Sequence, residues 1–442
     1  MSFIIQQSDE YLTSQSGLAL VGALVHRYKL PMLVDKINSL QARSNTFPNS
    51  DVVVSVIGLL AQGKCDFEDI EPFRQDKFFV QSLLLSKRFA PSSPTIRQRL
   101  DTASDKWDQA LLEANTSMLA GEAEITPCWK DYVPLDVDVS PFDNSNSKKE
   151  GVSCTYKKID GYAPIFAHLG KEGHLVNLQL REGKTHCQCG TPEFLRNSIK
   201  IARKITDKLL LVRLDSGNDS VDNIKVCRNE GSDFIIKRNL RKESLEDWLW
   251  IAQTYGCSKE PRPGKVEYLG SLMVSHDELD EPIRIVFKVV LRTIDLNGQY
   301  LITPEIEVET YWTSLMIPPL TIIDLYNDHG TSEQFHSEFK GDMGLERLPS
   351  GYFATNTRVM FLGLLAYNIL RLIGQSSLKF DYYAKKRKKV FRRRLRSVIQ
   401  DLIYLASRMV NHANRLRISF GQYCPVYEVF KQLYYRWAFN TT

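Results

Sequence analysis

The feature that most constrains the fold of this sequence is the apolar run "KLLLVRLDSG", residues 208–217, which ends in an acid and a turn. A short apolar run bounded by turn residues is typical of a strand that is buried on both faces. Such strands occur in sheets whose two faces are covered by helices. The run therefore predicts an α/β fold, with Asp215 at the end of a buried strand.

The segments around this run predict a larger sheet. "VPLDVDVS" alternates, so its apolar residues fall on one strand face and Asp136 and Asp138 fall on the other. Further strand patterns are "GYAPIFAHLG", "HLVNLQLREGK" and "SDFIIKRN", and "TPEFLRNSIKIARKI" predicts a helix. This order of strands, helix and buried strand indicates an α/β sheet with a covered face.

At 442 residues the chain is too long for one ordinary core, so we expect several segments. Apolar residues at spacings of three and four predict a helical region over residues 1–125. The first part of the α/β core spans 126–240, and strand patterns such as "IRIVFKVVLRTI" predict a β-rich insertion over 241–318. Helices over 319–375 end the core, and 376–442 form a basic helical region that includes a helix through "IQDLIYLASRMVNHANRLR".

The positive charge of the chain is concentrated in one segment. The net charge is only +5, yet "KKRKKVFRRRLR", residues 385–396, is basic except at Val390, Phe391 and Leu395. Such a segment either binds phosphate backbones, here through Lys388 and Arg393, or forms a solvated helix face.

Arg97 is a second basic candidate. It lies early in the helix that opens at "APSSPTIRQRLD" and either enters a DNA groove or belongs to a helix of a plain bundle.

Cysteine usage and hydropathy indicate a cytoplasmic protein without a membrane partner. The eight cysteines are scattered without the rhythm of a disulfide framework. No apolar run reaches the roughly 18 residues that a membrane span needs. "THCQCG" raises the alternative of zinc at His186, Cys187 and Cys189, but no second close pair accompanies it.

Three acids form a candidate metal site. Asp138, with Asp136 beside it, and Asp215 each lie at the polar face or end of an apolar strand, where a carboxylate must be paired or bind a cation. Taken singly, such an acid is more often a turn former or a helix cap. The third acid is Glu333. Two strand carboxylates and one helix carboxylate form the oxygen-rich set that hard divalent cations prefer, and a two-metal site supports phosphoryl displacement.

Glu333 belongs to "YNDHGTSEQFHSEFK", residues 326–340, which predicts one helix. At about 100° per residue, Tyr326, His329, Glu333 and Lys340 fall within a sector of about 60°. A polar stripe of this kind is either solvated or directed at a site.

These motifs resemble those of DDE transposases encoded by bacterial insertion sequences. Asp138 followed by Val-Ser, Asp215 in "VRLDSG", and "YNDHGTSEQFHSEFK" resemble their three acidic motifs. In one branch the third motif carries Tyr, Arg, Glu and Lys at set spacings, which Tyr326, Glu333 and Lys340 match. The resemblance also covers "KKEGVSCTYKKIDGYAPIFAHLG", "REGKTHCQCGTPEFL" and "LPSGYFATNTRVMFLGLLAYNIL".

The resemblance implies a ribonuclease H-like catalytic core and cut-and-paste DNA transposition. Asp138, Asp215 and Glu333 would hold two Mg²⁺ ions, for which Mn²⁺ would substitute. The implied partners are double-stranded DNA, as terminal inverted repeats and as target, and a second copy of the chain in the synaptic complex. The helical region 1–125, together with the basic C-terminal helix, would recognise the terminal inverted repeats. A bacterial, nucleoid-associated location follows from the same resemblance.

Further contacts to DNA are also implied by the resemblance. Tyr326 and Lys340 would contact the DNA backbone near the cut, and Trp312 would stack on a flipped base, with Trp248 and Trp250 as rivals. His329 stands where the family has Arg, and an imidazole lacks the fixed fork of a guanidinium. The resemblance still implies that His329 contacts the DNA phosphate, although more weakly than arginine would, or that another group supplies this contact, and the consequence of the exchange stays open.

Two questions about the chemistry also stay open. Spacing does not decide whether Asp136 or Asp138 is the metal ligand, although the acid-x-Ser pattern favours Asp138. The alternatives to an active transposase are a catalytically silent DNA-binding protein derived from one and a metal-dependent nuclease of the same fold.

Overall fold

The computed structural model describes residues 3–37, 47–380, 390–413 and 415–439. The chain forms two compact units, each built from separate stretches of sequence. The sheet unit contains Ile125–Pro141 and Ala163–Phe335, and the helical unit contains Met1–Glu124, Phe142–Tyr162 and His336–Thr442.

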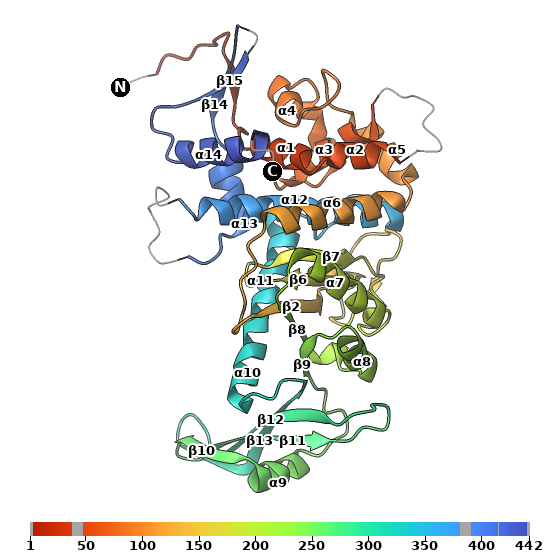
Figure 1. The fold of residues 1–442 in the computed structure, drawn as a ribbon, viewed down its shortest axis with the longest axis vertical. Helices are drawn as coiled ribbons and strands as arrows, with labels where there is room; N and C mark the ends of the chain where they lie inside the picture. The colour runs from red at the N-terminus through yellow and green to blue at the C-terminus, as the bar shows by residue number, and fades with distance from the viewer. Residues whose placement is uncertain (1–2, 38–46, 381–389, 414, 440–442) are drawn as a thin grey trace. The chain divides into compact units, whose positions relative to one another are not determined.

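A nine-stranded mixed sheet forms the sheet unit (Figure 1), in the order β10-β11-β12-β13-β9-β8-β2-β6-β7. Strands β2, β8 and β9 run parallel, whereas β6 runs antiparallel to β2 and β7 antiparallel to β6. The predicted α/β organisation is therefore confirmed for this unit. Its core elements are β2 (Tyr132–Val139), β6 (Ile165–Leu169), β7 (His174–Gln179), α7 (Thr191–Ile205), β8 (Leu209–Leu214), η2 (Ser216–Asn218), α8 (Val221–Asn229) and β9 (Asp233–Lys237).

The apolar run within residues 208–217 forms β8. All of its residues except the first are buried, as expected of a central strand between parallel neighbours. Helix α7 covers part of the sheet with an apolar stripe that includes Phe194, Ile199 and Ala202. The buried strand places the carboxyl end of β8, and therefore Asp215, at one edge of the core.

The predicted insertion is part of the same sheet. It consists of α9 (Leu245–Tyr255), β10 (Cys257–Arg262), β11 (Lys265–Val274), β12 (Ile283–Ile294) and β13 (Tyr300–Thr313). Strand β13 pairs with the core strand β9, for example Trp312 with Ile236. Hydrogen bonds of the sheet therefore run from the insertion into the core without a break.

The predicted single helix over residues 326–340 is wrong. The segment begins within α10 (Pro319–Asn327), passes through a 3₁₀ turn, η3 (Asp328–Thr331), continues as α11 (Ser332–Ser337), and ends in a π-helix, η4 (Glu338–Asp342). A 3₁₀ turn holds about 3.0 residues instead of 3.6, and a π-bulge holds more. The angular positions calculated for one α-helix therefore do not apply across the segment.

The helical unit is built around α12 (Phe353–Ser377). By length and composition α12 passes for a membrane span, but 89% of its most apolar window is buried, as expected of a core helix. The other elements are β1 (Tyr11–Thr13), α1 (Leu18–Arg27), α2 (Leu30–Asp35), α3 (Asn49–Leu60), η1 (Phe67–Phe73), α4 (Lys77–Ser82), α5 (Ser93–Thr102), α6 (Lys106–Glu122), β3 (Phe142–Asp143), β4 (Ser153–Cys154), β5 (Asp160–Tyr162), α13 (Leu395–Val398), η5 (Ile399–Ile403), β14 (Ser407–His412), β15 (Arg415–Phe420) and α14 (Tyr427–Ala438).

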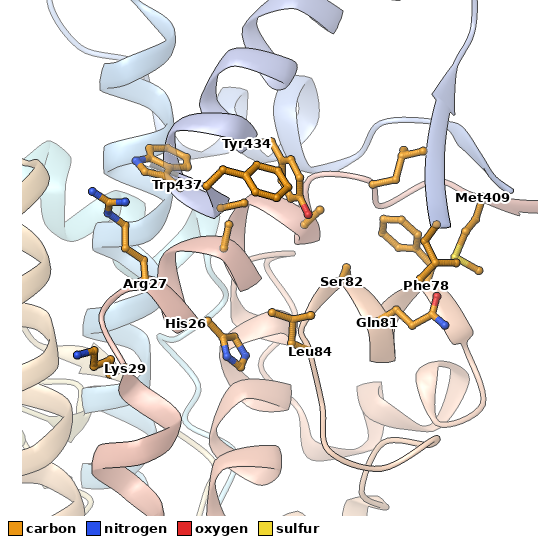
Figure 2. Close-up of a pocket in the computed structure, with 16 residues that line it drawn as sticks. His26, Arg27, Lys29, Phe78, Gln81, Ser82, Leu84, Met409, Tyr434 and Trp437 are labelled. Atoms are coloured by element: carbon orange, nitrogen blue, oxygen red, sulfur yellow. The ribbon is translucent and has the colours of Figure 1, made fainter. Parts of the chain in front are cut away.

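The helix predicted over residues 399–417 is also wrong, because helical structure ends at Ile403 and a β-hairpin follows. Strands β14 and β15 pair antiparallel, and β1 pairs with β14. One face of the hairpin lines a cavity of about 840 Å³ beside α1, α4 and α14 (Figure 2). Met409, Leu416 and Ile418 are the hairpin residues that line it. The alternation of these apolar residues toward one face fits a strand and not a helix.

Arginines of the basic segment support the helical unit from within. Glu338, which is 2% exposed, accepts hydrogen bonds from Arg371 and Arg392. Arg394 donates two hydrogen bonds, of 2.9 and 3.0 Å, to the carboxylate of Asp342. These buried or half-buried pairs connect the basic segment to η4 and α12.

We expect Glu338→Gln to destabilise the helical unit strongly, because it leaves two guanidinium groups without their carboxylate. Breaking a buried ion pair costs about 3–5 kcal/mol. Urea denaturation followed by circular dichroism measures the free energy of unfolding. Glu428→Gln is the matched control, since the Glu428 side chain is 49% exposed and pairs only with Lys431 at 3.8 Å. Equal midpoints for the two variants would contradict the structural role of Glu338.

Candidate active site

Asp138 and Asp215 lie side by side at the edge of the core sheet. In the parallel pairing of β2 with β8, Val137 is opposite Leu214, so the next residues along the two strands are Asp138 and Asp215. Both side chains are half-buried. The carboxyl ends of neighbouring parallel strands are where open α/β sheets bind their ligands. The sheet therefore brings two of the three predicted acids together.

The Asp215 carboxylate also caps the turn that follows β8. Its Oδ1 accepts hydrogen bonds from the backbone N–H of Asn218 at 3.2 Å and from Asn218 Nδ2 at 2.9 Å. Asp215 is thus a turn former, as the simpler interpretation of the sequence holds, and these bonds also fix the direction of its carboxylate.

Asp136 is occupied by other partners. Arg213, its neighbour on β8, donates Nε–H to Oδ1 at 2.6 Å and Nη2–H to Oδ2 at 2.7 Å. His329 Nδ1 lies 3.0 Å from the same Oδ1, at ion-pair distance. Burial alone would raise the pKa of Asp136, but the charges of Arg213 and His329 outweigh it and hold the pKa well below its usual range. The arrangement favours Asp138 as the acid of this strand that is directed to a ligand.

Tyr326 lies beside the two aspartates. Burial and the negative charges of Asp215 and Asp138 raise the pKa of its hydroxyl, which stays protonated at physiological pH. Its ring packs 4.9 Å from the ring centroid of Tyr311. A protonated phenol in this position is a hydrogen-bond donor at the edge of the acid pair.

Glu333 is the predicted ligand that the fold does not bring to the pair. It lies in the first turn of α11 and is exposed. Within the described ranges no three His, Cys, Asp or Glu side chains are close enough to hold a metal ion, and this includes the residues of "THCQCG". The donor chemistry still fits a hard divalent cation, because two aspartate carboxylates face one edge of the sheet.

His329 is not an exposed residue of a polar helix face, as the predicted stripe of residues 326–340 implied. Its side chain is 8% exposed and faces Asp136. The 3₁₀ turn η3 directs it inward, and the expectation of a direct phosphate contact at this position does not fit the structure.

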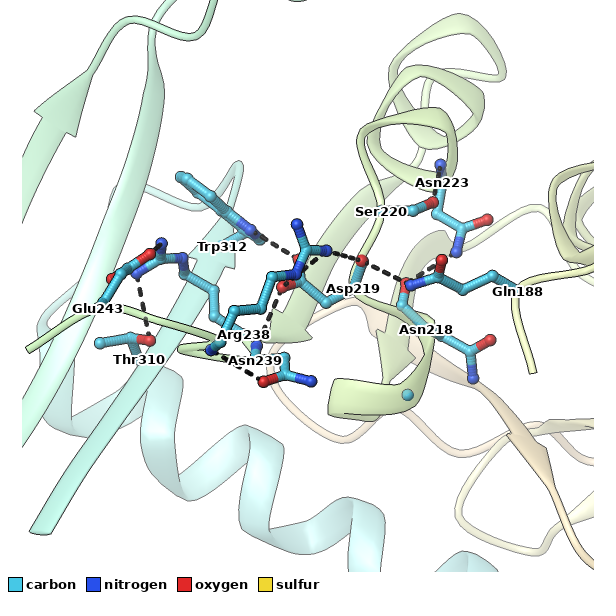
Figure 3. Close-up of polar contacts among 12 residues, drawn as sticks. Gln188, Asn218, Asp219, Ser220, Asn223, Arg238, Asn239, Glu243, Thr310 and Trp312 are labelled. Atoms are coloured by element: carbon cyan, nitrogen blue, oxygen red, sulfur yellow. Dashed lines mark hydrogen bonds and ion pairs between the residues drawn. The ribbon is translucent and has the colours of Figure 1, made fainter. Parts of the chain in front are cut away.

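Trp312 is held by a polar cluster around Asp219 (Figure 3). Its Nε1–H donates to Asp219 Oδ1 at 3.0 Å, and the guanidinium carbon of Arg238 lies 4.4 Å from the centroid of its ring. The side chain is buried, so it offers no open face to a base. Arg238 also packs against Trp248, whereas Trp250 is 61% exposed. Of the three tryptophans, Trp250 is the one that is open to a ligand.

The other predicted DNA contacts belong to the helical unit. Arg97 is exposed but paired with Glu68 at 2.7 Å. Ser92 caps its helix. Arg393 is 7% exposed and pairs with Asp401, which differs from the expected free phosphate contact. Lys340 is half-buried with its Nζ 5.3 Å from the ring centroid of Phe142. Lys388 lies outside the described residues.

Sequence reasoning missed two basic residues near the aspartates. Arg213 is the one charged residue inside the otherwise apolar β8, and that exception was the available signal. Lys237 ends β9, with its Nζ 3.0 Å from Glu309 Oε1 and 5.9 Å from the ring centroid of Tyr326. Nothing local in the sequence distinguishes Lys237 from an ordinary strand-end lysine.

We expect Trp312→Phe to lower the free energy of unfolding by about 2 kcal/mol, because hydrogen bonds to a charged group contribute about 1.5–3 kcal/mol. Trp250→Ala, the exposed control, should change it by less than about 0.5 kcal/mol. Thermal and urea melting of the two variants measure the difference. A Trp312→Phe protein as stable as the parent would rule out the packing role of this indole.

Comparison with known proteins places this geometry in a family. A family model described as "Transposase DDE domain group 1" matches residues 4–438. The solved structure titled "Cryo-EM structure of piggyBac transposase synaptic complex with hairpin DNA (SNHP)" matches at 10% identity and a TM-score of 0.41, covering 90% of this chain and 82% of that one. That TM-score does not establish a shared fold, and no curated protein matches. Since the family model spans nearly the whole sequence, the chain belongs to the transposases of DDE domain group 1.

Proposed function

We propose that this chain is an active DDE transposase that cleaves DNA at the ends of an insertion sequence and joins the freed 3′ ends to target DNA. One observation carries the proposal: Asp138 and Asp215 stand side by side at the ends of neighbouring parallel strands in a chain of a DDE family. The mixed sheet with these acids at its edge also supports a ribonuclease H-like core.

Three carboxylates would hold the metal in this proposal, namely Asp138, Asp215 and Glu333. Two Mg²⁺ ions, or Mn²⁺ in their place, would activate the attacking oxygen and stabilise the leaving oxygen when bound. The hydrogen bonds from Asn218 keep the Asp215 carboxylate directed. Tyr326, protonated beside the pair, would donate a hydrogen bond to a non-bridging phosphate oxygen and so orient the scissile strand.

Binding of DNA phosphates requires exposed basic side chains that do not already form ion pairs with carboxylates of the protein. Arg393 and Arg394 of the basic segment are bound to Asp401 and Asp342. On the β14–β15 hairpin, by contrast, Arg415 and Arg417 are exposed and form no ion pair in the described part of the chain. Their partners across the hairpin, His412 and Val410, place both arginines on the face opposite the cavity.

A two-stranded ribbon of this kind fits the major groove of DNA, and arginines on its face would contact phosphates or bases. We therefore assign the first DNA contact of the helical unit to the hairpin. Two copies of the chain are expected on the DNA, because a synapsis joins two ends.

Glu333→Gln, Asp138→Asn and Asp215→Asn should each abolish Mg²⁺-dependent cleavage while leaving DNA binding within about threefold of the parent, since the carboxylates act in chemistry more than in affinity. A labelled end-sequence duplex, Mg²⁺ and a denaturing gel for nicks, hairpins and joined products measure cleavage. Glu278→Gln, whose side chain is 63% exposed in the same unit, is the control and should cleave normally.

Two outcomes of that assay would select the alternatives. Parent protein that binds the duplex but never cleaves it would indicate a catalytically silent DNA-binding protein. Nicking without any joined product would indicate a nuclease of this fold.

The double variant Arg415→Gln/Arg417→Gln should weaken DNA binding and reduce the salt slope of log K by about two units, because each lost phosphate contact removes about 0.9 of slope. Fluorescence anisotropy at several salt concentrations measures both quantities. Arg196→Gln removes an arginine that already pairs with Glu193 at 2.5 Å, and it should leave the slope unchanged. If the hairpin variant keeps the parental slope, the two arginines only protect an edge strand from pairing.

A further inference from the structure

Each proposed metal ligand follows shortly after a member of one buried ionic cluster. Asp136 precedes Asp138 on β2, Arg213 precedes Asp215 on β8, and His329 precedes Glu333 on the helical segment. The three elements that carry the proposed ligands therefore meet in this cluster.

The contacts within the cluster are short and directional. The guanidinium of Arg213 forms a two-bond fork with Asp136, at 2.6 and 2.7 Å, and its remaining Nη1–H donates to the carbonyl of Leu325 at 2.6 Å. Leu325 lies in the last turn of α10, directly before the 3₁₀ turn that carries His329. One arginine therefore connects both acid-bearing strands to the segment that leads to Glu333.

Burial strengthens these contacts and restricts the motion of the side chains that form them. The side chains of Arg213, Asp136 and His329 are 3%, 2% and 8% exposed. A planar guanidinium bound by a carboxylate fork has little freedom, and electrostatic attraction is stronger away from water. Because residues two apart on a strand point to the same face, fixing Asp136 and Arg213 also fixes the directions of Asp138 and Asp215.

We propose that Asp136, Arg213 and His329 are positioning residues: they fix the directions of Asp138 and Asp215 and anchor the segment that carries Glu333, for binding of divalent metal and the scissile phosphate. The proposal rests on the proposed function. It also accounts for histidine where related third motifs carry arginine: Arg213 already supplies the guanidinium, and a second one at position 329 would face it across Asp136.

The experiment uses the full-length protein and the double variant Asp136→Asn/Arg213→Gln, which replaces the ions by amides of similar size. His329→Arg and His329→Gln accompany it. Mn²⁺ binding is measured by electron paramagnetic resonance of free Mn²⁺, folding by thermal melting, and cleavage of a labelled end duplex as kcat and KM. The control is Arg292→Gln/Glu307→Gln, which removes a pair at 2.7 Å on the insertion sheet.

We expect the double variant to melt near the parental temperature and to bind Mn²⁺ about tenfold more weakly. Its kcat should fall by about 10–100-fold while its KM stays within about threefold of the parental value. Loss of supporting contacts around a metal site has effects of this size. His329→Arg should lose Mn²⁺ affinity and kcat in the same direction. The insertion control should match the parent in all three measurements.

Parental Mn²⁺ affinity and kcat in the folded double variant would overturn the proposal. Should that variant fail to fold, His329→Gln decides, because it leaves the Asp136–Arg213 pair intact: unchanged Mn²⁺ affinity and kcat would overturn the positioning role of the cluster at Glu333. Failure of the proposed function is a separate result, since it is read from the parent protein alone, as the absence of cleavage or of joined products, whatever the variants do.

Discussion

The buried ion pair between Arg213 and Asp136 is the interaction on which the geometry of the candidate site depends. Removing two charges from water costs several kcal/mol per ion, so such a pair persists only when its hydrogen bonds are satisfied. Here the carboxylate receives both bonds of the fork, and the carbonyl of Leu325 takes a further one. A shift of β2 by one residue along β8 would place Arg213 opposite Leu135 or Val137 and leave both ions unpaired. The pair therefore selects the register that sets Asp138 beside Asp215.

Much of this core was predictable from local patterns. The alternation of "VPLDVDVS" and the apolar run before Asp215 correctly predicted β2 and β8, because burial imposes those patterns directly on the sequence. The adjacency of Asp138 and Asp215 follows from the parallel pairing of β2 with β8. The choice between Asp136 and Asp138 did not follow, since it depends on which acid meets Arg213, and strand pairing is a non-local property.

The errors have a common physical origin. The sequence of residues 326–340 predicts one helix because its periodicity does not reveal a change from α to 3₁₀ to π geometry. Likewise, no local sequence pattern shows that Arg393 pairs with Asp401, or that Glu338 forms ion pairs with both Arg371 and Arg392. A hairpin forms where the sequence predicts a helix, and its apolar residues face a cavity shared with elements distant in the sequence. Tertiary partners override local signals at each of these positions.

The continuity of β13 with β9 has a consequence for modular exchange. The strands of the insertion extend the core sheet, and the Trp312 indole reaches Asp219 just beyond the carboxyl end of β8. A chimaera that received residues 241–318 from a relative would have to reproduce this pairing and this hydrogen bond together. Excising the insertion would instead uncover the edge of β9 at Ile235 and Ile236, an apolar edge open to pairing with other chains. The insertion and the core are one piece of sheet, so we expect substitutions to be tolerated better at its exposed outer strand, β10, than where β13 pairs with β9.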